Sequence, residues 1–299
     1  MNPVRIVPFL ACLFWVFTAS GAEMRDLILV AGQSNAVGFD AYADELPADD
    51  RDTKVLFWWR CGDPPPDEFD CTSGRRWSHL QAQPRTEPMQ GEDAKRVGRQ
   101  YGNFKKAVGG FGPEIGLARA LAAVEQRPLA IVKAAFSGTS VAGDWNVGEA
   151  GSKSACYRAL LEETRAAVAA AREQGVTLRL RALVWVQGES DANAQNAPAY
   201  AVNLARMVAR LREDLGAPEL PVLLGVNVRF GNGNNPHMPA VIEAQQAVAS
   251  ADGHARYVDT AGAETLPPSH THFTAVGTLD VGRRYAEALR ALEAVVKSR

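Results

Sequence analysis

Three short turns and one loop of this sequence combine small residues with polar side chains that could carry out acyl transfer. The turns lie at 32–35, 137–140 and 187–191, and the loop at 269–274 contains two histidines. A serine hydroxyl attacks an ester carbonyl when a neutral imidazole within hydrogen-bond reach takes up its proton. Ser34 is therefore the candidate nucleophile, and a histidine of the loop is the candidate base.

The two histidines that compete for the role of base are His270 and His272. We favour His272, because packing of the neighbouring Phe273 would fix its position. Simpler interpretations exist for each residue taken alone. A serine at a helix start often serves as an N-cap, and most loop histidines lie at the surface. The chemistry therefore depends on whether the four segments converge.

Amide groups in the same turns could stabilise an oxyanion. The candidates are the backbone N–H groups of Ser34 and Gly138 and the side-chain amide of Gln187, which can all donate to developing negative charge. The simpler interpretation is that Gly138 is a turn residue and Gln187 a polar strand end.

The elements that must position these residues alternate along the chain. Strands are predicted at 26–31, 55–59, 129–135, 178–186, 220–228 and 255–259, and helices at 115–125, 155–174, 198–215, 239–251 and 274–297. This order predicts an α/β fold, a three-layer sandwich with a mostly parallel sheet. Ligands bind beyond the carboxyl ends of such strands, and three of these strands end in the polar turns.

The domain organisation expected from the sequence is a single domain over 23–299 with an irregular insertion at about 60–110. The insertion contains Pro64-Pro65-Pro66 and many charges. It is too long for a plain connection, so we expect it to wall or cover a site, or to be partly disordered.

Residues 1–22 have the form of a secretory signal peptide. Arg5 precedes an apolar run at 7–17, and small residues precede a cleavage point after about Ala22. The alternative is a membrane anchor, but the run is too short to span a bilayer. We therefore expect a secreted or periplasmic protein without a membrane span.

The overall charge argues against several partners. With 32 basic and 34 acidic side chains, the formal net charge is −2. This balance provides no basic field for nucleic acid or for an anionic membrane. We see no His/Cys cluster with zinc-ligand spacing and expect no metal and no cofactor. The sequence leaves the oligomeric state open.

Three cysteines remain once the leader is removed, namely Cys61, Cys71 and Cys156. Cys61 and Cys71 are ten residues apart and could pair in an oxidising compartment. Whether they do depends on geometry that the sequence does not specify. Cys156 is expected to be a buried helix residue.

Four blocks of this sequence resemble those of SGNH (GDSL-type) hydrolases. The blocks are Gly32-Gln33-Ser34-Asn35-Ala36, the segment 133–140 followed by Trp145, the segment 185–191, and the segment 272–286. The GQSN form is similar to that of the branch containing sialate O-acetylesterases and the acetyl xylan esterases of carbohydrate esterase family 6. The resemblance runs from Asp26 to about Leu289 and leaves out most of the insertion.

The resemblance implies a flavodoxin-like SGNH hydrolase fold, metal-free ester hydrolysis and an acetylated carbohydrate substrate. Carried over by position, Ser34 is the nucleophile, His272 the general base and Gly138 the oxyanion glycine of the second block. Gln187 stands where other SGNH enzymes have an oxyanion asparagine. Glu189 would be a supporting residue that orients Gln187 or neighbouring loops.

One position departs from the family pattern. The family usually has an Asp three residues before the catalytic histidine, and this chain has Ser269 there. Glu264 or Asp259 could replace that acid. Alternatively, a backbone carbonyl or Ser269 could hold the imidazole of a Ser-His dyad, at a large loss of turnover.

Two other functions remain open at this level. The missing acid suggests a carbohydrate-binding or cell-surface module on an inactive scaffold. A thioesterase or lipase-like esterase is the second alternative. Trp58, Trp59 and Trp145 could stack on sugar rings, although core packing is the simpler role for each.

Overall fold

The computed structural model describes residues 23–65, 71–85, 104–148 and 154–297. The expected signal peptide at 1–22 lies outside the described residues, as does part of the insertion. Among the described residues, the structure contains no helix that is both long and apolar enough to cross a membrane.

An eight-stranded sheet forms the middle of the fold, in the order β3-β2-β5-β1-β6-β7-β8, with β4 also paired to β2. Six strands run parallel to one another, namely β2, β5, β1, β6, β7 and β8. The short strands β3 and β4 run antiparallel to β2. The strands are β1 Glu23–Gly32, β2 Leu56–Gly62, β3 Cys71–Thr72, β4 Ser78–His79, β5 Leu129–Phe136, β6 Val176–Val186, β7 Val222–Gly225 and β8 Ala255–Tyr257.

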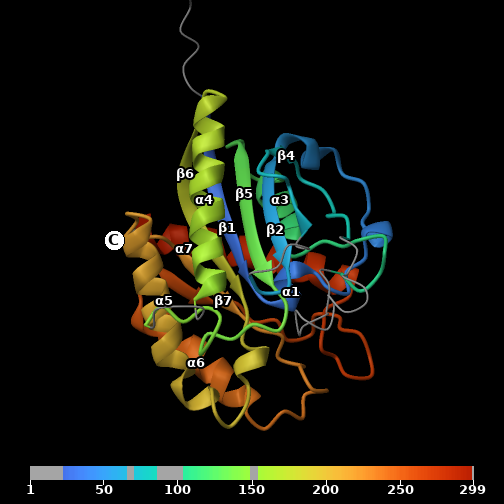
Figure 1. Cartoon of the computed structure of the whole chain (residues 1–299), viewed down its shortest axis with the longest axis vertical. Coiled ribbons are helices and arrows are strands. Elements are labelled where there is room, and N and C mark those ends of the chain that lie inside the picture. Colours follow the sequence, from blue (N-terminus) through green and yellow to red (C-terminus); the bar gives the residue numbers. More distant parts are fainter. Residues whose placement is uncertain (1–22, 66–70, 86–103, 149–153, 298–299) are drawn as a thin grey trace, which may run out of the picture.

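Helices cover both faces of this sheet (Figure 1). The helices are α1 Ser34–Val37, α3 Glu114–Ala122, α4 Ala155–Glu173, α5 Tyr200–Asp214, α6 Met238–Ala251 and α7 Ala275–Lys297. Short 3₁₀ segments are η1 Ala43–Glu45, η2 Asp50–Lys54, η3 Glu189–Asp191 and η4 Ala197–Ala199. The predicted three-layer α/β sandwich with a mostly parallel sheet is confirmed.

The central strand β1 separates two cores because successive strand side chains point to opposite faces. Ile28 and Val30 belong to the core that α3 and α7 cover, while Leu27 and Leu29 belong to the core under α4, α5 and α6. Burial on both faces explains why this strand reads as an unbroken apolar run. The indoles of Trp58, Trp59 and Trp145 are at most 6% exposed and are core residues, which rules out sugar stacking in this conformation.

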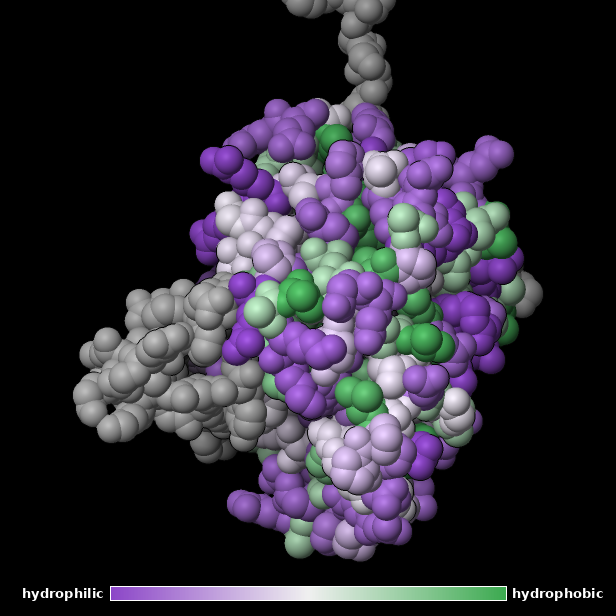
Figure 2. All heavy atoms as spheres, turned by 90° about the vertical axis from the view of Figure 1, so that its right-hand side faces the viewer, coloured by the Kyte–Doolittle hydropathy of each residue, from purple (hydrophilic) through white to green (hydrophobic). Residues whose placement is uncertain are grey.

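On the face shown in Figure 2, hydrophobic residues are interspersed with hydrophilic ones. The exposed large hydrophobic side chains are far apart along the chain, for example Met24, Val124 and Val202. Scattered apolar residues of this kind are normal for a protein surface.

Several strand ends differ from the sequence prediction, and two of the differences lie near the polar turns. The predicted strand at 55–59 is β2, which continues to Gly62 because it pairs with β5 up to Phe136. The predicted strand at 220–228 ends early, at Gly225, where a Cβ would lie 2.3 Å from the Tyr285 hydroxyl of α7. The residues after Gly225 leave the sheet and approach the polar turns.

Register brings the polar turns together at the carboxyl edge of the sheet. Gly32 at the end of β1 pairs with Ala135 of β5 and with Val186 of β6. The turns beginning at Gln33, Ser137 and Gln187 therefore start at the same level. The short helix α1 lies at this edge, next to the arrowhead of β5 (Figure 1).

Candidate active site

Ser34 is the first residue of α1 and follows β1 after a one-residue turn. The chain passes so close to β6 that a Cβ on Gly32 would lie 2.1 Å from the carbonyl oxygen of Val186. Only glycine fits there, and its φ is +143°. Because the first N–H groups of a helix have no intrahelical acceptor, the Ser34 N–H is available for an anion.

His272 is held by an acid that the sequence analysis did not identify. Its Nδ1 lies 2.7 Å from Oδ2 of Asp40, which follows α1 on the segment that carries Ser34. The ring of Phe39 packs beside the imidazole, with ring centroids 5.0 Å apart. The structure therefore brings Asp40, on the segment that begins at Ser34, to a histidine loop near the carboxyl end of the chain.

The two acids expected as alternatives, Asp259 and Glu264, are both exposed. The Asp259 carboxylate accepts a hydrogen bond from the N–H of Ala261. Ser269 accepts a bond from the Thr271 hydroxyl. Among the described residues, the carboxylate that pairs with His272 belongs to Asp40 and not to Glu264 or Asp259, the two acids that the sequence had offered for this role.

Charge and hydrogen bonding keep Asp40 ionised. Burial raises the pKa of its carboxyl, but the hydrogen bond and charge of His272, the Tyr42 hydroxyl and the Lys105 ammonium together lower it below its usual value. Tyr42 donates to Oδ1 at 2.9 Å, and Lys105 lies 3.4 Å from the same oxygen. An ionised carboxylate only accepts, so Nδ1 of His272 carries the shared hydrogen, and Nε2 is the ring nitrogen that can take up a proton.

His270 has a different environment. Its Nδ1 lies 2.7 Å from the hydroxyl of Thr265, and its Nε2 lies 3.3 Å from the Arg229 guanidinium. Both ring nitrogens are therefore engaged by side chains other than a carboxylate. The buried Phe273 ring anchors the loop beside His272.

Asn35 connects the nucleophile turn to the histidine loop. Its Nδ2 donates to the carbonyl of Thr271 at 3.1 Å, and its Oδ1 accepts from the N–H of Phe273 at 3.1 Å. These are the two residues on either side of His272. In the sequence, Asn35 is part of the first motif block, and its position next to Ser34, the candidate nucleophile, was the one signal available for it.

Glu189 supports the loop that carries His272 through Asn35 and Asn227. Its Oε1 accepts hydrogen bonds from Nδ2 of Asn35 at 2.8 Å and from the N–H of Asn227 at 3.1 Å. Asn227 in turn donates through Nδ2 to the carbonyls of His270 and Thr271. Burial raises the pKa of Glu189. Of the two roles expected for Glu189, its contacts fit the support of neighbouring loops rather than of Gln187.

Gln187 does not have a free amide hydrogen in this structure. Its Nε2 donates to Asp191 at 2.6 Å and to the carbonyl of Thr139 at 3.1 Å, while Tyr200 donates to its Oε1. An amide has two hydrogens to donate, and both are used. The geometry is therefore at odds with the expectation that Gln187 donates to the oxyanion.

These contacts instead hold the second turn. Asp191 also accepts hydrogen bonds from the N–H groups of Val141 and Ala142. The turn thus held contains Gly138, which is exposed and has φ of +67°, the left-handed region that favours glycine. The backbone N–H groups of Ser34 and Gly138 remain as the candidate oxyanion donors.

A buried ion pair supports the far end of α1. The Lys133 ammonium donates to the carbonyl of Val37 at 2.8 Å, to Gln83 at 2.8 Å and to Glu114 at 2.9 Å. The Lys133 and Glu114 side chains are fully buried. Gln83 also lies in the expected insertion, so this part of it is packed against the core.

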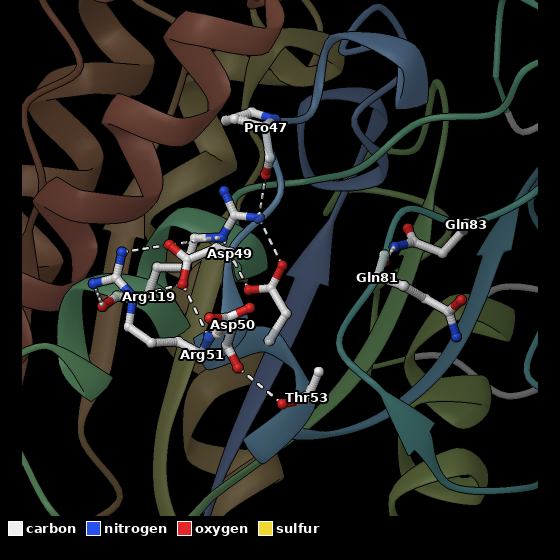
Figure 3. Close-up of polar contacts among 9 residues, drawn as sticks. Pro47, Asp49, Asp50, Arg51, Thr53, Gln81, Gln83 and Arg119 are labelled. Carbon is white, nitrogen blue, oxygen red and sulfur yellow. Dashed lines mark hydrogen bonds and ion pairs between the residues drawn. The ribbon is translucent and has the colours of Figure 1, made fainter.

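A second charged network fastens the segment that follows Asp40 to helix α3. Arg119 donates to Asp52 and to the carbonyl of Pro47, while Arg51 binds Asp49 and the carbonyl of Arg119 (Figure 3). The hydrogen bond from Arg51 lowers the pKa of Asp49 to about 2, against a smaller effect of burial. The path of the chain after Asp40 is therefore fixed at several points.

The described residues contain no group of three or more His, Cys, Asp or Glu side chains arranged to hold a metal ion. Ser34 lies at the carboxyl edge of the sheet, and Asn35 beside it bonds the loop that carries the pair of His272 and Asp40. This combination can carry out nucleophilic acyl transfer.

Comparison with known proteins agrees with this chemistry. A protein of Arabidopsis thaliana named as a probable carbohydrate esterase is 27% identical over 185 residues, which cover 60% of this chain and 64% of that protein. This chain thus matches less than two thirds of its relative's length. The X-ray structure of an Arabidopsis thaliana protein has a TM-score of 0.64 at 20% identity, covering 89% of this chain and 98% of the other.

A carbohydrate acetylesterase from Xanthomonas citri also shares the fold. Its TM-score is 0.59 at 17% identity, covering 90% of this chain and 56% of the other. At these identities the structural matches show the fold alone. The family profile described as carbohydrate esterase, sialic acid-specific acetylesterase, matches residues 24–291, which is most of the chain. The resemblance seen in the sequence is confirmed, and the chain belongs to the sialic acid-specific acetylesterase family of SGNH-type carbohydrate esterases.

Proposed function

We propose that the protein is a carbohydrate O-acetylesterase in which Ser34, His272 and Asp40 form a catalytic triad. The observation that carries this proposal is the 2.7 Å contact between His272 Nδ1 and the Asp40 carboxylate. That contact orients the imidazole, selects the tautomer with a free Nε2 and stabilises the imidazolium that forms during catalysis.

The reaction would proceed in two acyl transfers. Nε2 of His272 takes the proton of the Ser34 hydroxyl as Oγ attacks the acetyl carbonyl, and returns it to the departing sugar oxygen. Water then attacks the acetyl-enzyme with His272 again as base, which releases acetate and restores Ser34. The N–H groups of Ser34 and Gly138 would stabilise the oxyanion in both steps.

The substrate class rests on family membership. The family profile and the Xanthomonas citri acetylesterase both point to acetyl groups on carbohydrate. The form of residues 1–22 supports a proposal that the enzyme acts after export, as a secreted or periplasmic protein.

The binding-module alternative was motivated by Ser269 in place of the usual acid. Because the Asp40 carboxylate lies 2.7 Å from His272, the Ser269 position is no longer a reason to expect an inactive protein. We therefore keep hydrolysis as the proposed function.

Acetate release tests the proposal directly. Wild type and Ser34→Ala are compared on an aryl acetate, on O-acetylated sialic acid and on acetylated xylan, with circular dichroism to confirm folding. We expect a loss of at least about 10³-fold in kcat in the variant. Equal activity in both proteins, or a folded wild type inactive on all three esters, would disprove it.

A chain-length series distinguishes the lipase-like alternative. An acetylesterase is expected to lose kcat/KM steeply from aryl acetate to aryl octanoate. A rise along the series would favour a lipase-like enzyme instead.

A further inference from the structure

We propose that Cys61 and Cys71 form an intramolecular disulfide that links strands β2 and β3 beside the candidate active site. These cysteines are not used by the proposed mechanism, and both are recorded as free thiols in the structure. The proposal rests on their register, their burial and their mutual contact, and it does not depend on the proposed esterase activity.

The register of the two strands places the cysteines directly opposite each other. In the antiparallel pair of β2 and β3, Arg60 pairs with Thr72 and Cys61 pairs with Cys71. Opposed residues of an antiparallel pair share one face and have Cα atoms about 4.5–5.5 Å apart. A disulfide needs Cα atoms about 4.4–6.8 Å apart, so the backbone need not move to join them.

The thiols already face each other. Cys61 is fully buried and Cys71 is 2% exposed, and each thiol shifts the pKa of the other. The indole N–H of Trp59 donates to Sγ of Cys71 at 3.2 Å. Register and burial therefore place the two thiols side by side in the core.

The electrostatics assign the order of attack. The hydrogen bond from the Cys61 thiol lowers the pKa of Cys71 despite burial, with help from Trp59 and Lys133. Burial raises the pKa of the Cys61 thiol. Since the thiolate is the nucleophile in exchange, Cys71 would attack first.

The oxidant would be a small disulfide such as oxidised glutathione. The Cys71 thiolate attacks one of its sulfurs, forming a mixed disulfide and releasing one glutathione thiolate. Cys61, losing its proton, then attacks Sγ of Cys71 and releases the second. Two electrons pass from the two protein thiols to the glutathione disulfide, and two molecules of reduced glutathione carry away the two protons.

The third described cysteine cannot compete for this bond. Cys156 is fully buried on α4 in the core on the opposite face of the sheet from Cys61 and Cys71. The sheet separates it from the pair. It therefore provides a matched control.

The disulfide would stabilise the short strand β3, which lies near the polar turn at 137–140. Strand β3 has only two residues, and the residue after it adds one bond, from Ser73 N–H to the carbonyl of Trp59. The carbonyl of Gly62, which follows Cys61, accepts from the N–H of Ser137 at 2.7 Å. Closing the loop between the cysteines restricts the unfolded chain and ties this edge of the site together.

The test is thiol counting on the full chain. The protein is incubated with oxidised glutathione, denatured, alkylated with iodoacetamide and weighed by intact mass spectrometry, then digested for peptide mapping. The full chain has four cysteines, and the chain without residues 1–22 has three. We expect the oxidised chain to show two fewer labels than the reduced chain and to give a linked peptide joining Cys61 to Cys71.

Two variants provide controls. Cys156→Ser should still lose two labels on oxidation, and Cys71→Ser should lose none. Thermal unfolding gives an independent measurement, with an expected fall of about 5 °C in Tm when wild type or Cys156→Ser is reduced. Full labelling of the oxidised wild type, or a linked peptide containing Cys156 instead, would overturn the proposal.

Discussion

The carboxylate of Asp40 and the imidazole of His272 lie 2.7 Å apart although 232 residues separate them in the chain. Asp40 is on the segment that begins at Ser34, the proposed nucleophile. This relationship replaces the local arrangement in which the acid shortly precedes the histidine.

Removing the Asp40 charge should impair catalysis far more than folding. We expect Asp40→Asn to lower kcat by about 10³–10⁴-fold, because the amide favours the wrong imidazole tautomer and no longer stabilises the imidazolium. The measurement is the kinetics of aryl acetate hydrolysis. Asp259→Asn and Glu264→Gln serve as controls and should stay within about threefold of wild type. A large loss in either control, with Asp40→Asn active, would reassign the acid.

The hydroxyl of Tyr42 should lower the pH at which the protein unfolds in acid. The pKa of Tyr42 is raised to about 12, first by burial and then by Asp40, so its hydroxyl remains a donor. The pKa of Asp40 is lower in the folded protein than in the unfolded chain. Asp40 therefore stabilises the fold at pH values above its unfolded pKa, and this stabilisation is lost as the pH falls through its folded pKa. Tyr42→Phe removes a bond that lowers this pKa, so the acid unfolding midpoint should move to higher pH.

Urea unfolding between pH 7 and pH 3 measures this shift. Tyr257→Phe is the matched control, because Tyr257 is a partly buried tyrosine on β8 that lies away from Asp40. The same midpoint in wild type and Tyr42→Phe would show that the hydroxyl does not support Asp40.

Asn35 should act on turnover through the position of His272. Asn35→Ala removes the bonds to the Thr271 carbonyl and the Phe273 N–H on either side of the histidine. We expect kcat to fall by about 10²-fold with little change in KM, since small displacements of a catalytic group are costly. Asn227→Ala should have a smaller effect, because Asn35 still holds Thr271. If the Asn35 variant raised KM alone, a role in substrate binding would be indicated instead.

The buried ion pair of Lys133 and Glu114 should affect the free energy of unfolding mainly because each side chain neutralises the charge of the other. Lys133→Met leaves the fully buried Glu114 carboxylate without its cation, which should lower the free energy of unfolding by about 3–5 kcal/mol. The double variant Lys133→Met with Glu114→Leu should be more stable than Lys133→Met alone. Chemical denaturation measures both, and a single variant as stable as wild type would contradict this account.

The sequence by itself determined the order of the elements and the four motif blocks. Leu27 to Val30 reads as a strand because each residue is apolar, and each is apolar because both faces of β1 are buried. Helix starts and turns are similarly local, since they depend on side chains within a few residues. The convergence of Ser34 and Gly138 followed from the rule that parallel strands end at one edge of the sheet.

Only the tertiary structure decided which polar groups are partners. A carboxylate becomes the acid of a histidine through distance and direction, and no local pattern encodes a contact between Asp40 and His272. The same holds for Gln187, because its side-chain amide donates both of its hydrogens to Asp191 and to the carbonyl of Thr139. A side-chain amide has a fixed number of hydrogens, so its role depends on the neighbours that the folded chain brings within about 3 Å.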